Sequence, residues 1–339
     1  MTQAAELATL AAGVTVQKLQ QTGTASPEEI LAFAVQAEYI HHPEVAQNLR
    51  QARYLKGTQI EIVRNRENTG HFQHAVFDHD GTISVLREGW EPVMEAMMIR
   101  AILGEQFMDA AEFDYQRILA SVREFIDIST GIQTILQMQA LVDMVTEFGF
   151  VPKRAILTAT GYKKIYNDAL MKQVNVRKER LERRELDVND FIVKGAVDLL
   201  NALCSQGVKL YLASGTDEED VKAEAEILGY APLFEGRIYG ASGDISKYSK
   251  KLVIDRIITG NNLQGPELIT FGDGPVEIRE TKKRGGIAVG VASDEVRRWG
   301  LNQVKRTRLI RAGADYIVPD FSQTSVMTQH ILDGFTFSE

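Results

Sequence analysis

Two aspartates stand one residue apart in the stretch HAVFDHDGTIS, directly after the apolar run 74–77. Side chains alternate along a β-strand, so Asp78 and Asp80 share one face if the strand continues through them, and His79 points away from both. Two adjacent carboxylates repel each other unless a cation lies between them. Mg²⁺ prefers hard oxygen ligands and also accepts the oxygens of a phosphate group, so the pair predicts a magnesium site for a phosphorylated ligand.

Two further apolar runs end in residues suited to the same chemistry. The run 208–214 ends at Ser214, and Gly215 and Thr216 follow, so that hydroxyl and backbone N–H groups precede a predicted helix, an arrangement that binds anions. The run 267–271 leads to Asp273, with Glu277 four residues further along. Parallel sheets bind ligands beyond the carboxyl ends of their strands, so these side chains are expected to meet at one edge.

The elements that must position these residues alternate along the chain. Apolar runs cover 208–214, 267–273, 286–293 and 314–320, and stretches with helical spacing of apolar residues cover 217–229, 250–260 and 276–285. Strands that alternate with helices indicate an α/β fold, a Rossmann-like doubly wound parallel sheet.

Between the first run at 74–77 and the next strand, the sequence has helical periodicity. Apolar residues three and four apart predict helices over 89–103, 113–129, 134–149 and 162–174. Upstream, Ser26 and Glu29 have the spacing of a helix start, and 58–65 has the pattern of an added strand. The predicted domains are an N-terminal, mainly helical extension (1–70), a core (71–88 and 190–339) and a helical cap (89–189).

Four motifs in order resemble a known family. DHDGT, the strand-final serine of LASGT, a lysine that opens a helix, and GDGPVE are similar to the motifs of the haloacid dehalogenase superfamily of phosphatases and phosphotransferases. The resemblance covers about residues 72–88 and 190–320. It implies the α/β core, and the position of the inserted helices, directly after the first motif, is where members of the family often carry a helical cap.

The resemblance also implies roles for individual residues. Asp78 is similar to the nucleophile that forms an aspartyl phosphate, and Asp80 to the general acid and base. The side chains of Asp78 and Asp273 and the backbone carbonyl of Asp80 would hold Mg²⁺. Glu277 stands where family members often have aspartate, so it would bind the metal either directly or through water. Ser214 and the N–H of Gly215 would bind the phosphoryl oxygens.

A lysine is expected beside the phosphoryl group, and three are candidates: Lys247, Lys250 and Lys251. Lys250 is favoured because Ile254 and Ile257 would bury the helix face that it shares. Its distance from Asp273 also resembles the family spacing, and Lys251 is the alternative.

Other polar residues have weaker predictions. Arg87, Glu88 and Trp90 follow the first motif where the chain leaves for the helical segment, so they are predicted either to contact substrate or to form a hinge. Gln133 is predicted to face the site from the cap. The glycine-rich stretch 236–243 lacks the context of a phosphate-binding loop and is predicted to be a turn.

Composition narrows the class of protein. A net charge of -8 and a pI near 5.4 argue against general nucleic-acid binding, which needs a surplus of Lys and Arg. The single cysteine, Cys204, excludes an internal disulfide framework, and no apolar stretch approaches the roughly 18 residues of a membrane span. We read no secretory signal and expect a cytoplasmic protein. The acidic surface gives no indication of oligomeric state.

The function predicted from these observations is a Mg²⁺-dependent phosphatase. Its substrate would be a small phosphorylated metabolite, either a sugar phosphate, a nucleotide or a phosphorylated acid, hydrolysed through an aspartyl phosphate. One alternative is a phosphomutase with the same two aspartates, and another is a non-catalytic metabolite-binding or assembly module. A dehalogenase is disfavoured, because the dehalogenases of this superfamily lack an acid at the position of Asp80.

Overall fold

The computed structural model describes residues 2–18, 24–36, 40–64, 72–242 and 248–332, and the chain divides into two compact units, 1–40 and 41–339. The first unit contains helices α1 (Thr2–Gln17) and α2 (Pro27–Gln36). The predicted start of α2 is confirmed: the Glu29 N–H donates to Ser26 Oγ at 3.2 Å, and the Ser26 N–H donates to the Glu29 carboxylate at 2.8 Å. This reciprocal pair satisfies N–H groups that a helix start leaves unpaired.

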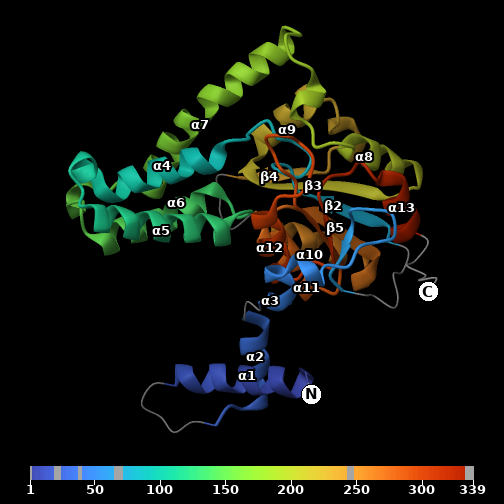
Figure 1. Cartoon of the computed structure of the whole chain (residues 1–339), viewed down its shortest axis with the longest axis horizontal. Helices are drawn as coiled ribbons and strands as arrows, with labels where there is room; N and C mark the ends of the chain where they lie inside the picture. Colours follow the sequence, from blue (N-terminus) through green and yellow to red (C-terminus); the bar gives the residue numbers. More distant parts are fainter. Residues whose placement is uncertain (1, 19–23, 37–39, 65–71, 243–247, 333–339) are drawn as a thin grey trace. The chain divides into compact units, whose positions relative to one another are not determined.

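The second unit is built on a mostly parallel sheet, which confirms the predicted α/β class (Figure 1). Its order within the described residues is β1-β7-β6-β5-β2-β3-β4, and β1 alone pairs antiparallel, with β7. Every residue of β2, β5 and β6 is buried, as expected when helices cover both faces of a parallel sheet. The strands are β1 (Glu61–Ile62), β2 (His74–Phe77), β3 (Lys209–Asp217), β4 (Ile238–Ala241), β5 (Leu268–Gly272), β6 (Ile287–Val291) and β7 (Tyr316–Val318).

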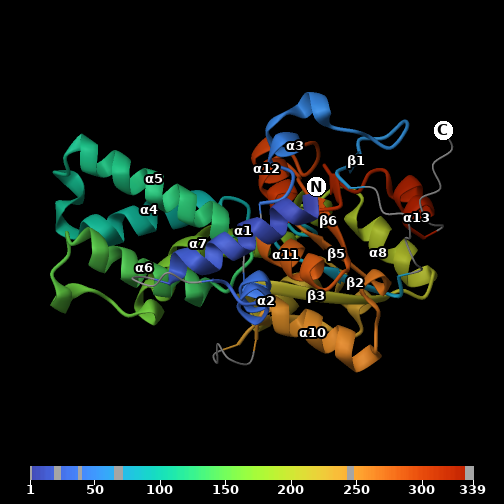
Figure 2. The same ribbon diagram turned by 90° about the horizontal axis from the view of Figure 1, so that it is seen from below.

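Helices pack on both faces of this sheet. On β2, Ala75 and Phe77 belong to the hydrophobic cluster formed with α8 (Ala196–Ser205), α9 (Glu218–Ile227) and α13 (Thr324–Leu332), whereas Val76 belongs to the cluster with α10. This alternation is the two-residue period of a strand buried on both sides. Figure 2 looks onto the other face, covered by α10 (Lys250–Asn261), α11 (Pro275–Lys283) and α12 (Gln303–Ala312).

Four of the five α-helices between β2 and β3, α4 to α7, lie at the positions predicted for the inserted helices. They pack on one another beside the sheet and are called the helical insertion below (Figure 1). Met94, Met98 and Met138 are fully buried and pack in its core. The helices are α4 (Trp90–Leu103), α5 (Glu112–Ser129), α6 (Thr134–Phe148) and α7 (Ala159–Glu182).

The prediction of a turn over 236–243 is wrong, because residues 238–241 form β4 at the edge of the sheet. The short edge strand pairs with β3, and Ile238 and Ala241 are buried there. Gly240 is needed for packing rather than for turning: a Cβ atom there would lie 2.4 Å from the Cα atom of Glu218. The added strand predicted within 58–65 is confirmed as the two residues of β1.

A buried arginine connects residues 45–61 to α12. The guanidinium of Arg306 donates to both carboxylate oxygens of Glu61, at 2.5 and 2.6 Å, and to the backbone oxygen of Ala46 at 3.1 Å. Both charged side chains are almost fully buried, so the pair fixes the position of α12, which carries Lys305, a residue of the site below. No helix in the described ranges is long and apolar enough to cross a membrane.

Candidate active site

The carboxyl ends of three neighbouring strands bring the predicted site residues together. Phe77 of β2 is in register with Leu212 of β3 and Phe271 of β5, so the residues that follow each strand emerge at the same edge of the sheet. A cavity of about 80 Å³ lies there. It is lined by Asp78, Asp80, Arg87, Trp90, Thr130, Gly131, Ile132, Thr134, Gln137, Tyr166, Leu170, Ser214, Gly215, Thr216, Lys250 and Asp273.

Three buried carboxylates form a cluster at this edge of the sheet, and two of them, Asp78 and Asp273, line the cavity. Asp78, Asp273 and Glu277 each offer an oxygen, and these oxygens lie within 4.8 Å of one another. Lys250 Nζ lies 2.7 Å from Asp78 Oδ2 and 2.8 Å from Glu277 Oε2. The three carboxylates are called the carboxylate cluster below. Lys250 supplies a cation that contacts two of them.

The electrostatics of the carboxylate cluster follow from burial. Burial raises the pKa of Asp78 well above its ordinary value; the cation of Lys250 opposes this, and the charges of Glu277 and Asp273 add to it. Burial alone would lower the pKa of Lys250, but the charges of Asp78 and Glu277 outweigh it and raise that pKa. The three carboxylates thus outnumber the single cation of Lys250. A buried set of hard oxygen donors with excess negative charge fits Mg²⁺.

A second buried lysine, Lys305 near the start of α12, was not predicted. Its Nζ atom lies 2.7 Å from Asp273 Oδ2 and 2.6 Å from Glu295 Oε1. Asn302 begins the helix by accepting from the backbone N–H of Lys305, and this cap is the only sequence signal for the position. Gly81, at φ +71°, passes so close that a Cβ atom would lie 2.2 Å from Asp273 Oδ2. This contact and the left-handed backbone both require glycine after Asp80.

The predicted phosphate donors lie at the end of β3. Ser214 is 1% exposed, and its Oγ accepts from the Thr216 N–H at 3.1 Å. The backbone of Gly215 lies against the helical insertion, because a Cβ atom there would be 2.4 Å from the backbone oxygen of Ile132. Only glycine permits this approach. Tyr248 fixes the same loop by donating its hydroxyl to the Ser214 oxygen at 2.5 Å.

Of the candidate lysines, the structure places Lys250 in the cavity. Ser249 caps α10 by accepting from the Leu252 N–H at 3.1 Å, which sets Lys250 as the first residue of the helix. Lys250 is 4% exposed, and Ile254 and Ile257 are buried on the same helix, as predicted. Lys251 is exposed. Lys247, the third candidate, lies outside the described residues.

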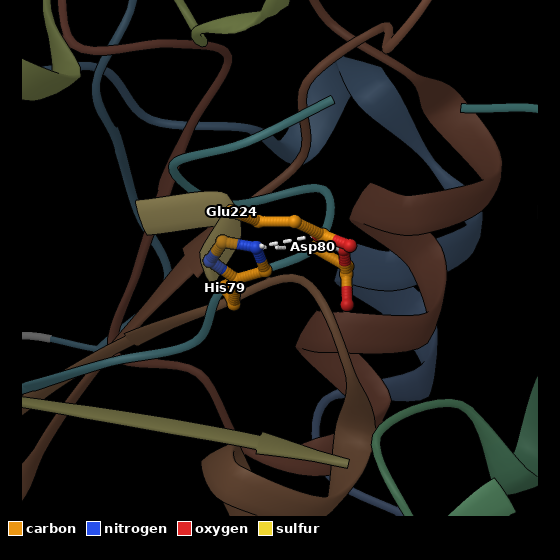
Figure 3. A group of neighbouring side chains, drawn as sticks. All are labelled: His79, Asp80 and Glu224. Carbon is orange, nitrogen blue, oxygen red and sulfur yellow. Dashed lines mark hydrogen bonds and ion pairs between the residues drawn. The ribbon is translucent and has the colours of Figure 1, made fainter. Parts of the chain in front are cut away.

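The prediction that His79 points away from Asp80 is wrong. β2 ends at Phe77, so the alternation of side chains does not continue through the motif. His79 Nε2 lies 3.2 Å from Glu224 Oε2 and 4.0 Å from Asp80 Oδ1, and the three side chains converge (Figure 3). His79 is fully buried, and its other ring nitrogen lies 3.0 Å from the Tyr230 hydroxyl.

Asp80 has one bonded and one unbonded carboxylate oxygen. Oδ2 accepts from Thr216 Oγ1 at 2.8 Å, whereas Oδ1 is buried with no hydrogen-bond partner among the described residues. Buried polar atoms without a partner are rare in proteins. Oδ1 is also the oxygen that lies 4.0 Å from His79 Nε2, so it faces the buried pair of His79 and Glu224.

The predicted substrate contacts have different positions. Arg87 lines the cavity, whereas Glu88 does not: it pairs with Arg177 of α7 at 3.1 Å. Gln133 is absent from the described lining and donates its amide to the Tyr248 oxygen at 2.6 Å. The helical insertion instead brings Thr134, Gln137 and Tyr166 to the cavity. Helical periodicity in the sequence places these residues on α6 and α7. It does not reveal that they face the cavity, because packing decides which face of a helix meets the core.

Comparisons with known proteins agree with this architecture. Residues 72–283 match the model of the haloacid dehalogenase-like hydrolase family. No curated protein matches the chain significantly in sequence.

Three solved structures are similar in fold. A predicted phosphoglycolate phosphatase from Haemophilus somnus 129pt is 16% identical with a TM-score of 0.50, covering 78% of this chain and 100% of its own. A β-phosphoglucomutase from Clostridium difficile is 15% identical with a TM-score of 0.50, covering 77% and 97%. A predicted phosphatase from Clostridium acetobutylicum is 18% identical with a TM-score of 0.48, covering 77% and 100%. The family model spans more than half of the sequence, and the chain belongs to the haloacid dehalogenase-like hydrolases.

Proposed function

We propose that this hydrolase is a Mg²⁺-dependent phosphatase that cleaves a small phosphorylated metabolite through an aspartyl phosphate. The observation that carries the proposal is the position of Asp78: a buried carboxylate 2.7 Å from the ammonium group of Lys250, in one cavity with Asp80 and Ser214. Phosphoryl transfer depends mainly on positioning and on neutralisation of charge, and this cavity combines a nucleophile, a cation and an acid.

In the first step, an Asp78 carboxylate oxygen attacks phosphorus. The new O–P bond forms as the bond to the ester oxygen breaks, and the leaving oxygen takes a proton from the Asp80 carboxyl. Asp78 Oδ1 accepts from the His79 N–H at 2.8 Å, which orients the carboxylate. Lys250, the hydroxyl of Ser214 and the N–H of Gly215 bind the oxygens of the transferred group.

In the second step, water hydrolyses the aspartyl phosphate. Asp80, now ionised, takes a proton from the water, whose oxygen attacks phosphorus. The bond between Asp78 and phosphorus breaks, inorganic phosphate leaves, and both carboxyl groups return to their starting states. The hydrogen bond from Thr216 Oγ1 to Asp80 Oδ2 orients the Asp80 carboxyl group for both proton transfers.

The metal site is part of the proposal. Asp78, Asp273 and the backbone carbonyl of Asp80 would hold Mg²⁺, with Glu277 bound directly or through water. When bound, the ion neutralises the charge of the phosphoryl oxygens and lowers the repulsion within the carboxylate cluster. The donor chemistry supports Mg²⁺, because carboxylate oxygens suit a hard cation.

The same proposal assigns the domains. Residues 71–88 and 190–339 form the core, 89–189 form a cap that excludes bulk water, and 1–70 form an extension. Contacts between the helical insertion and the core support a cap: Lys163 of α7 pairs with Asp217 at 2.6 Å, and Arg308 of α12 pairs with Asp127 of α5 at 3.2 Å. We propose the cytoplasm as the location, because a chain with a single cysteine fits a reducing compartment.

The test is a phosphate-release assay with the purified full chain in Mg²⁺, over sugar phosphates, nucleotides and phosphorylated acids. We expect release of inorganic phosphate from at least one class. An isomeric phosphate ester without free phosphate would identify a phosphomutase and overturn the proposal. No turnover of any phosphate ester would favour a non-catalytic module.

A further inference from the structure

We propose that the alcohol released from the ester is short, uncharged and hydroxylated, like a polyol or a small sugar, and that Thr134, Gln137 and Tyr166 bind its hydroxyl groups. This inference rests on the proposed phosphatase function and narrows its substrate class. It separates sugar phosphates from phosphorylated acids and nucleotides, which share the phosphoryl group and differ in the alcohol.

The first argument is the charge of the cavity wall. Two of the described lining residues are basic, and Lys250 belongs to the carboxylate cluster. The other, Arg87, already has two acidic partners. Its Nε and NH2 atoms donate to Glu224 at 3.0 and 2.7 Å, and NH2 also donates to Asp220 at 2.9 Å. The guanidinium charge is thus more than neutralised by protein carboxylates.

A carboxylate on the alcohol would therefore meet no uncompensated side-chain cation in the described lining. An ionised group that enters a desolvated cavity loses its hydration, and only a paired charge or several donors replaces it. Asp80 and Glu224 near the same guanidinium would repel a further anion. Substrates with a carboxylate near the phosphate are consequently disfavoured relative to matched neutral esters.

The second argument is the unused hydrogen-bonding capacity of the helical insertion. Tyr166 and Thr134 line the cavity. Within the described part of the chain, the hydroxyl group of neither residue makes a hydrogen bond. Tyr166 is 5% exposed. Burial raises the pKa of its hydroxyl, the charge of Arg87 opposes this shift, and the charges of Asp80 and Glu91 add to it.

Each of these hydroxyls can act as both donor and acceptor. The Gln137 amide, which donates to Ser129 Oγ at 3.2 Å, adds a third polar group on the same wall. Hydroxyl groups of a polyol match this set, because each also donates and accepts.

The third argument is size. The cavity of about 80 Å³ is far smaller than the several hundred Å³ that a drug-sized ligand needs. Beyond the phosphate-binding residues, the side chains of Trp90, Ile132 and Leu170 supply the apolar lining. The wall thus has apolar surface for C–H groups and polar groups for hydroxyls. A short polyol fits both properties.

The test compares glycerol 3-phosphate with 3-phosphoglycerate. These esters share a three-carbon skeleton and differ only in CH₂OH against a carboxylate. With p-nitrophenyl phosphate as a general ester, kcat/KM is measured for all three in Mg²⁺. We expect glycerol 3-phosphate to exceed 3-phosphoglycerate by at least ~10-fold, the equivalent of roughly one well-placed charge interaction.

The outcomes separate the two proposals. Equal or greater kcat/KM for 3-phosphoglycerate overturns the substrate inference but leaves the phosphatase function. Turnover of p-nitrophenyl phosphate without turnover of either three-carbon ester also overturns the substrate inference and leaves the phosphatase function. Absence of phosphate release from all three, and from the wider panel above, overturns the phosphatase function itself.

Variants locate the hydroxyl contacts. Tyr166→Phe and Thr134→Val are each expected to lower the ratio of kcat/KM for glycerol 3-phosphate over p-nitrophenyl phosphate by about 3- to 10-fold, the effect of one neutral hydrogen bond. Tyr162→Phe, one turn earlier on α7 and outside the described lining, is the matched control with an unchanged ratio. An unchanged ratio in both test variants, with normal unfolding temperatures, would contradict the assignment.

Discussion

The ammonium group of Lys250 lies 2.7 Å from the Asp78 carboxylate, and both side chains are almost completely buried. A charge that is taken out of water is stable only next to a partner, so the two groups depend on each other. The pair joins the end of β2 to the start of α10, and it sets the charge balance of the carboxylate cluster. Several measurable properties of the protein follow from this charge balance and from the buried pairs around it.

Asp78→Asn is expected to reduce phosphate release by about 10³-fold or more while the fold persists. Asparagine has nearly the same shape but cannot form the aspartyl phosphate, so the chemical step is lost. Phosphate release and thermal unfolding are measured together. Asp168→Asn, an exposed change on α7, serves as the control and keeps full activity. Wild-type turnover by Asp78→Asn would refute the mechanism.

Lys250→Gln and Lys251→Gln form a matched pair of neighbouring substitutions. The first leaves two buried carboxylates without their cation, so we expect a loss of activity of about 10²-fold or more and a lower free energy of unfolding by about 3 kcal/mol. The second removes an exposed charge, with an effect within about 0.5 kcal/mol and normal turnover. Urea unfolding and phosphate release distinguish them. Similar behaviour of the two variants would argue against the choice of Lys250.

Removal of Mg²⁺ with a chelator is expected to abolish phosphate release, and added Mg²⁺ should restore it. A ligand that binds only the folded state also stabilises that state, so Mg²⁺ should raise the unfolding temperature independently of turnover. In Asp273→Asn this thermal shift should become smaller, because one carboxylate ligand is lost. An equal thermal shift in both proteins would place the metal elsewhere.

The buried Glu224 predicts a pH dependence of stability. Burial would raise its pKa, but hydrogen bonds from His79 and Arg87 and the charge of Arg87 outweigh burial and lower the pKa to about 2. A depressed folded-state pKa stabilises the protein above the ordinary value of 4.5, and this stability is lost as pH falls toward 2. The loss between pH 6 and pH 3 is about 2 kcal/mol.

The measurement for this prediction is urea unfolding of the wild type and Glu224→Gln across that pH range. Glutamine cannot titrate, so the difference in free energy of unfolding between the two proteins should shrink as pH falls. Asp220→Asn changes the partly exposed partner of the same Arg87 and should cost less than about 1 kcal/mol at pH 7. A difference for Glu224→Gln that is constant with pH would exclude a depressed pKa.

The order of strands and helices was predictable because it depends on local patterns. The buried strands β2, β5 and β6 are continuous apolar runs, and the helices between them have apolar residues three and four apart. The error at 236–243 has the same origin. β4 is an edge strand of only four residues, and it contains a glycine that packs on Glu218. From composition alone, a short segment with glycines resembles a turn.

Part of the candidate site was predictable for a related reason. Asp78, Ser214 and Asp273 each follow an apolar run, and parallel strands in register end at one edge. His79 was misjudged because the strand stops at Phe77, and the backbone turn there depends on Gly81 and on the side chains of Asp273 and Lys305 beside it. Such contacts join segments far apart in the chain.

The sequence by itself determined the α/β order, the acidic motif and the polar residues at the strand ends, because these are properties of short segments. Only the tertiary structure decided that Lys305 and Glu224 are buried partners of the site, that Glu88 and Gln133 lie outside the cavity lining, and that Tyr166 belongs to it. The physical reason is that the burial and pairing of a charge depend on which helix faces pack together. That packing is fixed by the whole core rather than by the local pattern of residues.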